Sequence, residues 1–500
     1  MASLDVQAEH DESLELEREF GYPHELRRSL RQFSIWAVSF SVLAITTGIY
    51  LNYGFGLSNA GPVFVWTWPV VVFGQFLVAL VFADLSGRIP LTGYAYQWSS
   101  RLVNPTLGWF VGFFSLMFLL VGGAAIAFEL FVPVVGQLFG FATSSGVVSL
   151  GLSIGLIALV TLITCISVRV TSRVNNVAVF TDVAGALTAG VIVLVVWLFA
   201  RPAPIHHSLG FLLNTGGLSG GKLAYGLMLA LLMGCFTLTG FETAADLSEE
   251  AVNARITVPR AIIGSLLIAG VLGFLLIVGV TLAMPSLHAT QASTNPIPLA
   301  LQYTVGGAVT KFYLSVLAIT TVGLVTILVA AAGRVFFAMS RDNMLPASHL
   351  LRRVDRETGT PVLALVTAGI ITAGLVVYGF YSSASFGILV GGTAVFAFLV
   401  YFGAVASYTF VGHRVPPKID RFSLGSWTGP VKWGAFVWLV AALLVLTVPS
   451  VFRNTDWVVL ICAGLAVVWY ATVLRGRLAS GTAGARTSVT AVEEPRVVSK

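Results

Sequence analysis

Long apolar segments recur along the whole chain, and they restrict its fold more than any other feature of the sequence. Windows of about 20 residues, the length that crosses a bilayer as a helix, locate twelve such segments among the 500 residues. Only 10% of the residues are charged, against about 25% in a soluble globular chain. The sequence therefore predicts an all-α integral membrane protein with about 12 transmembrane helices. The predicted spans are roughly 33–56, 63–83, 107–131, 147–168, 177–200, 223–245, 261–283, 312–338, 361–380, 386–410, 431–450 and 456–474.

Basic residues indicate how the predicted helices cross the membrane. Arg27, Arg28 and Arg31 precede the first span, and residues 1–32 contain no apolar run typical of a signal peptide. With a cytoplasmic N-terminus, 24 of the 28 Lys and Arg fall on cytoplasmic segments, which is the usual charge bias. We expect a multi-pass protein of the plasma membrane with both termini cytoplasmic. This orientation explains the basic charge without a nucleic-acid partner, and nothing in the sequence points to an obligate protein partner.

Two of the spans carry Thr beside Gly at about half their depth, where helix propensity falls. The first contains AITTGIY at 44–50 and the sixth contains CFTLTGFE at 235–242. A helix that opens inside a bilayer exposes backbone N–H and C=O groups, which is tolerated only where they line a cavity or ligand site. Breaks in corresponding halves of a chain indicate the binding site of a secondary transporter. We predict that both helices unwind, near Gly48 and Gly240, and hold a substrate between them.

The predicted breaks suit a zwitterion. Both half-helices that follow them begin at mid-membrane, and such an end offers unpaired amides and about half a positive charge to a carboxylate. The carbonyls that end the first halves, near 43–45 and 235–237, suit an ammonium group. Binding would then need no buried Arg or Asp. The predicted substrate-binding residues are Ile45, Thr46, Thr47, Gly48, Ile49, Phe236, Thr237, Thr239, Gly240 and Phe241.

Residues 240–261 and 334–346 resemble the amino acid–polyamine–organocation (APC) permeases. The GFE of the sixth span and the RDNMLP after the eighth are the most specific parts of the resemblance. The turn at 56–62 is similar to the branch that contains amino acid, choline and GABA transporters. The family implies a LeuT-like 5+5 inverted repeat with helices 1 and 6 broken. It also suggests that Phe236 is an aromatic gate over the substrate, with ordinary core packing as the alternative.

The resemblance divides the chain into four parts. Residues 1–32 form a cytoplasmic tail, and 33–410 form a ten-helix transport core with repeats at about 33–200 and 223–410. Residues 411–475 supply a cytoplasmic loop and helices 11 and 12. The last part, 476–500, is rich in small and polar residues and is predicted to be a disordered cytoplasmic tail.

Two intramembrane acids are candidates for coupling and gating, because a charge in the bilayer core costs about 2.5–3.5 kcal/mol or more. Glu242 matches the family's glutamate in the sixth span and is predicted either to respond to protons or to bond the opened backbone. Asp182 lies where cationic amino acid carriers of the family tend to have Lys and choline or GABA relatives tend to have His. It departs from both patterns, which leaves H⁺ and Na⁺ as alternatives for the coupling ion; we favour the proton. No other cofactor and no metal site is predicted, since the cysteines are isolated and His206-His207 lacks a third ligand.

The sequence therefore predicts a secondary active permease, and not an enzyme, that moves an amino acid or related small zwitterion with proton coupling. The alternative is a transporter or exchanger of choline, GABA or another amine or polyamine. Residues 151–155 and 217–221 match the G-x-S-x-G pattern of hydrolases but lack its strand–turn–helix context. A channel would need a repeated filter motif or a ring of pore charges, which the sequence lacks.

Overall fold

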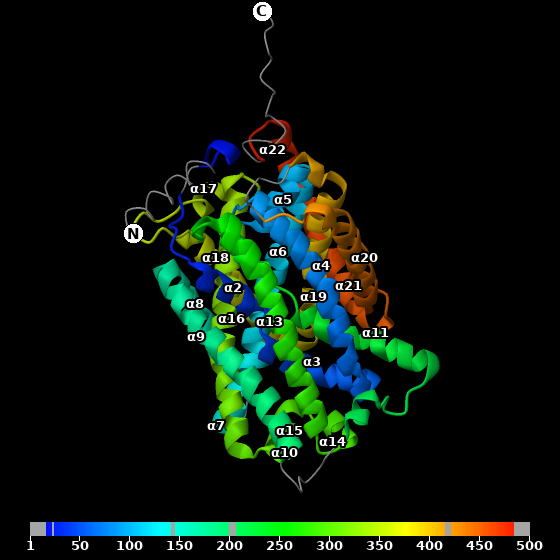
Figure 1. Cartoon of the computed structure of the whole chain (residues 1–500). Helices are drawn as coiled ribbons and strands as arrows, with labels where there is room; N and C mark the ends of the chain where they lie inside the picture. The colour runs from blue at the N-terminus through cyan, green and yellow to red at the C-terminus, as the bar shows by residue number, and fades with distance from the viewer. Residues whose placement is uncertain (1–16, 23–24, 142–145, 200–206, 416–421, 485–500) are drawn as a thin grey trace, which may run out of the picture.

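The computed structural model describes residues 17–22, 25–141, 146–199, 207–415 and 422–484. Within these ranges, twelve helical segments are long and apolar enough to cross a membrane, which confirms the predicted all-α membrane fold (Figure 1). Their helices are α2 (Gln32–Leu43) with α3 (Ile45–Ala60), α4 (Thr67–Arg88), α6 (Pro105–Ala125) with α7 (Val132–Phe139), α8 (Gly146–Ile166), α9 (Val168–Leu187) with α10 (Val193–Phe199), α11 (Gly220–Thr237), α13 (Ala254–Ala283), α16 (Gly307–Arg341), α18 (Val362–Tyr381), α19 (Ser383–Val411), α20 (Thr428–Thr447) and α21 (Arg453–Trp469).

Shorter helices lie between the spans, after the break in the sixth span, or after the last span. They are α5 (Tyr94–Leu102), α12 (Thr243–Asp246), α14 (Leu287–Ala292), α15 (Pro296–Thr304), α17 (Ser348–Leu351) and α22 (Arg475–Ala479). The connection at 87–98 is rich in aromatic residues, which is typical either of a short interfacial helix or of an ordinary loop with interfacial anchors. The structure has helix α5 there, and every residue of α5 is buried, so it packs inside the bundle and not along its surface.

The interrupted helices α2–α3 and α11–α12 lie among the other spans. Helix α2 packs against α13 and α9, α3 packs against α11, and α16 packs against both α9 and α6. Helices α20 and α21 pack chiefly on α4 and α19 and lie at one edge of the bundle in Figure 1. This arrangement places the two helix breaks in the protein interior, away from lipid.

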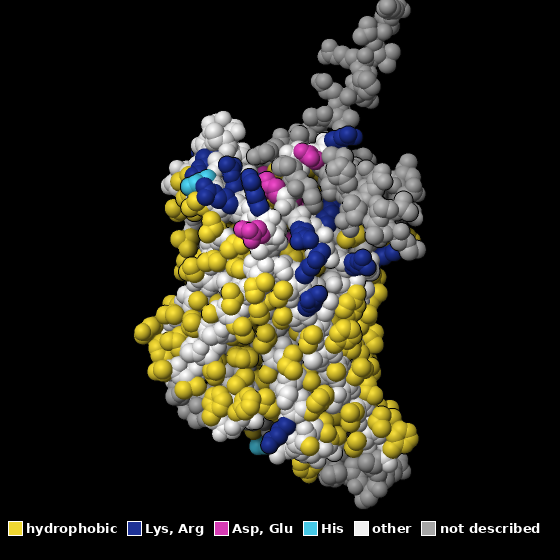
Figure 2. All heavy atoms as spheres, turned by 90° about the vertical axis from the view of Figure 1, so that its left-hand side faces the viewer, with side chains coloured by type: hydrophobic (Ala, Val, Ile, Leu, Met, Phe, Trp, Pro, Cys, Tyr) yellow, Lys and Arg dark blue, Asp and Glu magenta, His cyan; other side chains and the backbone are white. Residues whose placement is uncertain are grey.

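The two ends of the bundle differ in charge. One end carries α5, α17 and α22, and the other carries α14 and α15 (Figure 1). On the face in Figure 2, Lys and Arg gather at the first end, above a broad hydrophobic surface. We call this the basic end.

The C-terminal tail is ordered further than the sequence indicated. Residues 475–479 form α22, and Arg477 Nη1 donates to the carbonyls of Asn343 and Leu345, both at 3.1 Å. The amide of Gly484 donates to the Asp342 carbonyl at 2.9 Å. The prediction of disorder from residue 476 is therefore wrong for 476–484, because a basic side chain satisfies carbonyls at the end of α16. Residues 485–500 lie outside the described part of the chain.

Candidate functional site

The first membrane span is broken at Ala44. Helix α2 ends at Leu43, Ala44 has a left-handed backbone (φ 38°, ψ 63°), and α3 begins at Ile45. The Ala44 amide donates to Phe40 O at 3.2 Å, and the Gly48 amide donates to Ala44 O at 2.8 Å. The predicted span is therefore correct, but the break precedes Gly48 by one helical turn. Gly48 itself lies inside α3.

Gly48 serves close packing instead of unwinding. A Cβ at this position would lie 2.7 Å from Thr237 Cγ2 and 2.8 Å from Thr237 Oγ1. Such separations are shorter than a van der Waals contact, so only glycine lets α3 approach the end of α11 this closely. The Thr-Gly pattern in the first span thus marks where the two interrupted helices meet.

The second break lies where the sequence placed it. Helix α11 ends at Thr237, Gly240 has φ 91°, and helical structure resumes only as the four-residue α12. The Tyr401 hydroxyl accepts from the Gly240 amide at 2.8 Å and donates to Glu242 Oε2 at 2.5 Å. Ser39 Oγ on α2 donates to the Phe241 carbonyl at 2.5 Å. Side chains from α2 and α19 therefore satisfy the opened backbone, and Glu242 is joined to it through Tyr401.

A cavity of about 50 Å³ lies between the two breaks. Five of the predicted binding residues line it, from α3, the end of α11 and the break that follows α11: Thr47, Gly48, Phe236, Thr237 and Thr239. The other five do not line it. Ile45, Thr46, Ile49, Gly240 and Phe241 are buried in the surrounding packing.

The remaining cavity walls were not among the predicted binding residues, although the sequence did place the carbonyls near 43–45 at the site. They come from the end of α2, from α6 and the turn after it, and from α16 and α19: Val42, Leu43, Ala44, Phe118, Gly122, Ile126, Leu324, Leu328, Thr393 and Ala394. Thr393 Oγ1 is buried and has no hydrogen-bond partner among the described residues. A hydroxyl in that state is costly unless a ligand or water pairs with it. Small residues at 122–123 and 391–394 were the only sequence signal for the walls on α6 and α19.

Asp182 contacts the start of α3. Its side chain is 1% exposed, and Oδ1 accepts from the Thr46 amide at 3.3 Å and from the Thr46 hydroxyl. A carboxylate from α9 thus already contacts the N-terminus of α3, where a negative charge is stabilised. The other oxygen, Oδ2, has no partner among the described residues.

Helix α16 places a second unpaired oxygen at the level of Asp182. Gly185 on α9 packs against Val316, and Gly323 packs against Ala178, so α9 and α16 run antiparallel with Thr320 level with Asp182. Thr320 is buried and its Oγ1 is also without a partner in the described part of the chain. No cluster of three His, Cys, Asp or Glu suited to a metal ion occurs within the described ranges.

Residues 30–471 match the amino acid permease family. The chain belongs to this family. Amino-acid permease BAT1 of Arabidopsis thaliana is 26% identical over 88% of this chain and 89% of its own length. The GABA-specific permease of Saccharomyces cerevisiae is 24% identical over 70% of the chain and 63% of its own length. The thiamine transporter thi9 of Schizosaccharomyces pombe is 24% identical over 91% and 84%. As predicted, this permease is a multi-pass membrane transporter of amino acids.

The basic end of the permease is closed by ion pairs beneath the second break. Arg341 contacts both carboxylate oxygens of Glu249 at 2.9 and 3.0 Å, and Arg334 Nε lies 3.0 Å from Glu250 Oε1. These pairs join the end of α16 to residues 248–250, which follow α12 directly. Breaking a buried pair of this kind costs about 3–5 kcal/mol, so the pairs hold the basic end shut.

The N-terminal segment adds a plug over these pairs. Phe20 and Tyr22 are 0% and 4% exposed. The Tyr22 hydroxyl donates to Asp342 Oδ1 at 2.5 Å, and the Arg341 guanidinium lies 3.8 Å from the centre of the Tyr22 ring. The N-terminal segment is therefore packed over the end of α16, beside the ion pair of Arg341.

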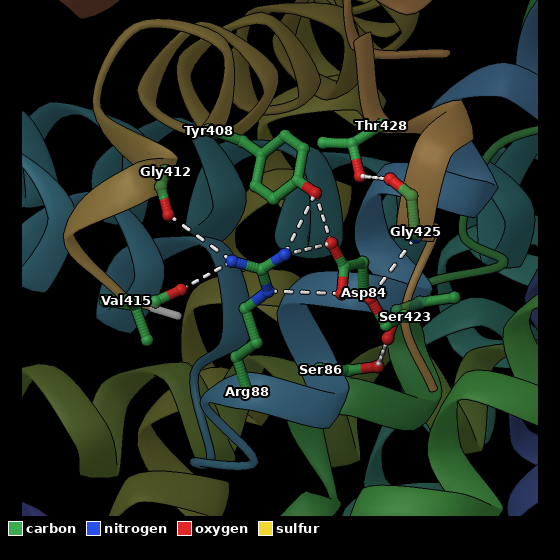
Figure 3. Close-up of polar contacts among 10 residues, drawn as sticks. Asp84, Ser86, Arg88, Tyr408, Gly412, Val415, Ser423, Gly425 and Thr428 are labelled. Atoms are coloured by element: carbon green, nitrogen blue, oxygen red, sulfur yellow. Dashed lines mark hydrogen bonds and ion pairs between the residues drawn. The ribbon is translucent and has the colours of Figure 1, made fainter. Parts of the chain in front are cut away.

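At the same end, an ion pair within α4, between Asp84 and Arg88, is hydrogen-bonded to α19 and the residues that follow it (Figure 3). Arg88 donates to both oxygens of Asp84 at 3.1 and 2.6 Å and to the carbonyls of Gly412 and Val415. The Tyr408 hydroxyl donates to the same aspartate. Because each charged group has several partners, this network holds α4 against α19.

Proposed function

We propose that this permease couples the transport of a small neutral amino acid or GABA to protons, with Asp182 as the proton carrier. The observation that carries the proposal is the position of Asp182, whose carboxylate is bonded to the start of α3. The substrate carboxylate would use the same helix end. Two carboxylates at one helix N-terminus repel each other, so protonation of Asp182 would favour substrate binding.

The cavity walls support this choice of substrate. The Thr47 amide at the start of α3 suits a carboxylate, and the last carbonyls of α2, at Val42 and Leu43, suit an ammonium group. Helix α12, with four residues, is too short to offer a second helix end, so we place the carboxylate at α3. The lining contains no Asp, Glu, Lys or Arg, which disfavours a polyamine.

The size of the cavity favours a small substrate. A cavity of about 10–15 Å³ holds one water, so the cavity of about 50 Å³ has space for a few waters. A larger amino acid would require α6 or α16 to move outward. Phe236 lies in the wall, as a gate over the substrate would require.

Proton coupling accounts for both oxygens of Asp182 better than sodium does. Protonation of Oδ2 would neutralise a buried charge on an oxygen that has no hydrogen-bond partner among the described residues. A sodium ion would need several more oxygen ligands than Asp182 Oδ2 and Thr320 Oγ1. We also propose that the basic end faces the cytoplasm of the cell, as the charge bias of membrane proteins implies, so that both termini are cytoplasmic and the membrane is the plasma membrane.

The test is uptake of a labelled-substrate panel into proteoliposomes under a pH gradient, a Na⁺ gradient, or neither. The panel contains glycine, alanine, GABA, leucine, choline, thiamine and putrescine. The proposal expects accumulation of small neutral amino acids or GABA that follows the pH gradient and ignores Na⁺. Accumulation driven only by Na⁺, or preference for the amines, would contradict it.

A further inference from the structure

A second cleft lies at the basic end, outside the cavity between the helix breaks. Its volume is about 840 Å³, and it lies between the N-terminal segment, the end of α16 and the loop that leads to α18. Four of the residues that line it are arginines. The lining residues are Glu25, Arg341, Arg352, Arg353, Val354, Asp355, Arg356 and Gly359.

The loop that carries the arginines is held in shape by its own hydrogen bonds. Asp355 Oδ1 accepts from the Thr358 amide at 2.8 Å and from the Glu357 amide at 3.1 Å, and the Asp355 amide donates to Thr360 O at 2.9 Å. The hydrogen bond from the Thr358 amide is the main reason that the pKa of Asp355 lies below its usual value. The charge of Asp355 is thus engaged by its own loop, which leaves it poorly placed to neutralise the arginines beside it.

Glycine holds this loop against the N-terminal segment. Gly359 has φ 67°, and a Cβ there would lie 2.8 Å from Arg27 Cβ. The loop therefore packs closely on the N-terminal segment, and both contribute residues to the wall of the cleft.

Three arginines present unpaired positive charge to the cleft. Arg352, Arg353 and Arg356 are exposed, and none forms an ion pair with another residue in the part of the chain that the structure describes. Guanidinium groups bind phosphate oxygens with two parallel hydrogen bonds. The fourth arginine, Arg341, lines the same cleft while it pairs with Glu249. This arrangement suits a ligand with a phosphate group.

Apolar residues beside the arginines place the cleft at the membrane surface. Leu350 and Leu363 are 38% and 44% exposed, and they lie on either side of the arginines in the sequence. Helix α18, a membrane span, begins at Val362. A surface with exposed leucine next to arginine is suited to the boundary between acyl chains and headgroups. A soluble anion would bind the arginines but would make no apolar contact with the exposed leucines.

We propose that this cleft binds the headgroup phosphate of an anionic lipid, and that the bound lipid makes the basic end easier to open. The lipid would come from the cytoplasmic leaflet, so this inference rests on the orientation proposed above. The phosphate would attract the Arg341 guanidinium, which otherwise holds Glu249 and covers the Tyr22 ring. Transport should therefore be faster in an anionic bilayer.

The full-length chain carrying R352Q, R353Q and R356Q together tests the site. The matched control carries R169Q, R173Q and R475Q, which removes three exposed arginines that do not line the cleft. Binding of short-chain phosphatidylglycerol is measured by native mass spectrometry. Because a basic residue near an anionic surface contributes about 1 kcal/mol, we expect each lost cleft arginine to weaken binding by about fivefold, and the control to bind as the parent does.

Uptake is then compared in vesicles of phosphatidylcholine with and without phosphatidylglycerol. The parent and the control should be faster with phosphatidylglycerol, and the cleft variant should show the same rate in both. Counterflow in phosphatidylcholine alone, which needs neither an anionic lipid nor a proton gradient, should be intact in all three. A failure of proton coupling would leave the lipid-binding result unaffected, so the two proposals can be judged separately.

Three outcomes would overturn the lipid proposal. The first is equal loss of lipid binding in the cleft variant and the control, which would make the effect one of general charge. The second is displacement of the lipid by inorganic phosphate at similar concentration, which would indicate a soluble anion. In the third, phosphatidylglycerol binds tightly only after residues 1–16 are removed, which would make the acidic segment containing Asp11, Glu12 and Glu15 the natural occupant.

Discussion

Replacing Asp182 with Asn should uncouple substrate binding from pH. The change keeps the shape of the side chain and an oxygen that can accept from Thr46, but it removes the ionisable group. In the parent, an ionised Asp182 lies 3.3 Å from the Thr46 amide, and a substrate carboxylate on the next amide of the helix would lie about 6 Å from it. At an effective dielectric constant of about 20, two such charges repel by about 3 kcal/mol, or about a hundredfold in affinity.

The parent should therefore bind substrate about a hundredfold more weakly when Asp182 is ionised than when it is protonated. Its affinity should fall as the pH rises, whereas the affinity of Asp182→Asn should be the same across that range. Equilibrium binding of labelled substrate to purified protein, without any gradient, measures both. The size of the effect comes from Coulomb repulsion at one helix end, so high salt should change it little in a buried site.

Transport provides the second measurement. With one proton per substrate, a gradient of one pH unit supplies about 1.36 kcal/mol, so the parent should accumulate substrate about tenfold and Asp182→Asn should only equilibrate it. Counterflow is the control, because exchange needs a working site but no proton gradient. If Asp182→Asn retains counterflow and still accumulates substrate as the parent does, the assignment of Asp182 is refuted.

Three further substitutions test the packing and the cavity. Gly48→Ala should lower the thermal unfolding midpoint, with a cost of about 1–3 kcal/mol for overpacking, and Thr237→Ala in the same chain should restore most of it; no change in the single variant would contradict the close contact. Thr393→Val should raise KM about three- to tenfold through the loss of one hydrogen bond to the substrate. Its unfolding midpoint should not fall, since the hydroxyl has no partner within the described residues. Tyr401→Phe should cost about 1–3 kcal/mol of stability because Glu242 and an opened amide lose their partner, and a midpoint equal to the parent's would refute that role.

The spans were predictable because the bilayer imposes them. A segment in lipid must be apolar and must bond its own backbone, so hydropathy alone located all twelve. The second break was also readable, since Gly240 adopts a positive φ that glycine permits without cost.

The first break could not be predicted from the residue at which it occurs, Ala44. Alanine is the best helix former, and only the surrounding packing holds Ala44 in a left-handed conformation. The cavity walls on α6, α16 and α19 were hidden for a related reason. Each of those helices is apolar on every side, so the face turned toward the cavity is decided by how the helices pack. Thr393 could be recognised only once that rotation was known.

The break in the first span falls at Ala44, a residue that disfavours the left-handed backbone found there. An L-amino acid with a Cβ in the left-handed region is less stable there by about 1–2 kcal/mol than in a right-handed helix, and Ala44 accepts that penalty at φ 38°. This penalty favours a straight first span, and contacts with the neighbouring helices keep the span bent. A glycine at position 44 would remove the backbone penalty and make the bent conformation more stable. A single methyl group in the wall of the cavity would then shift the balance between the bent and straight forms of the first span.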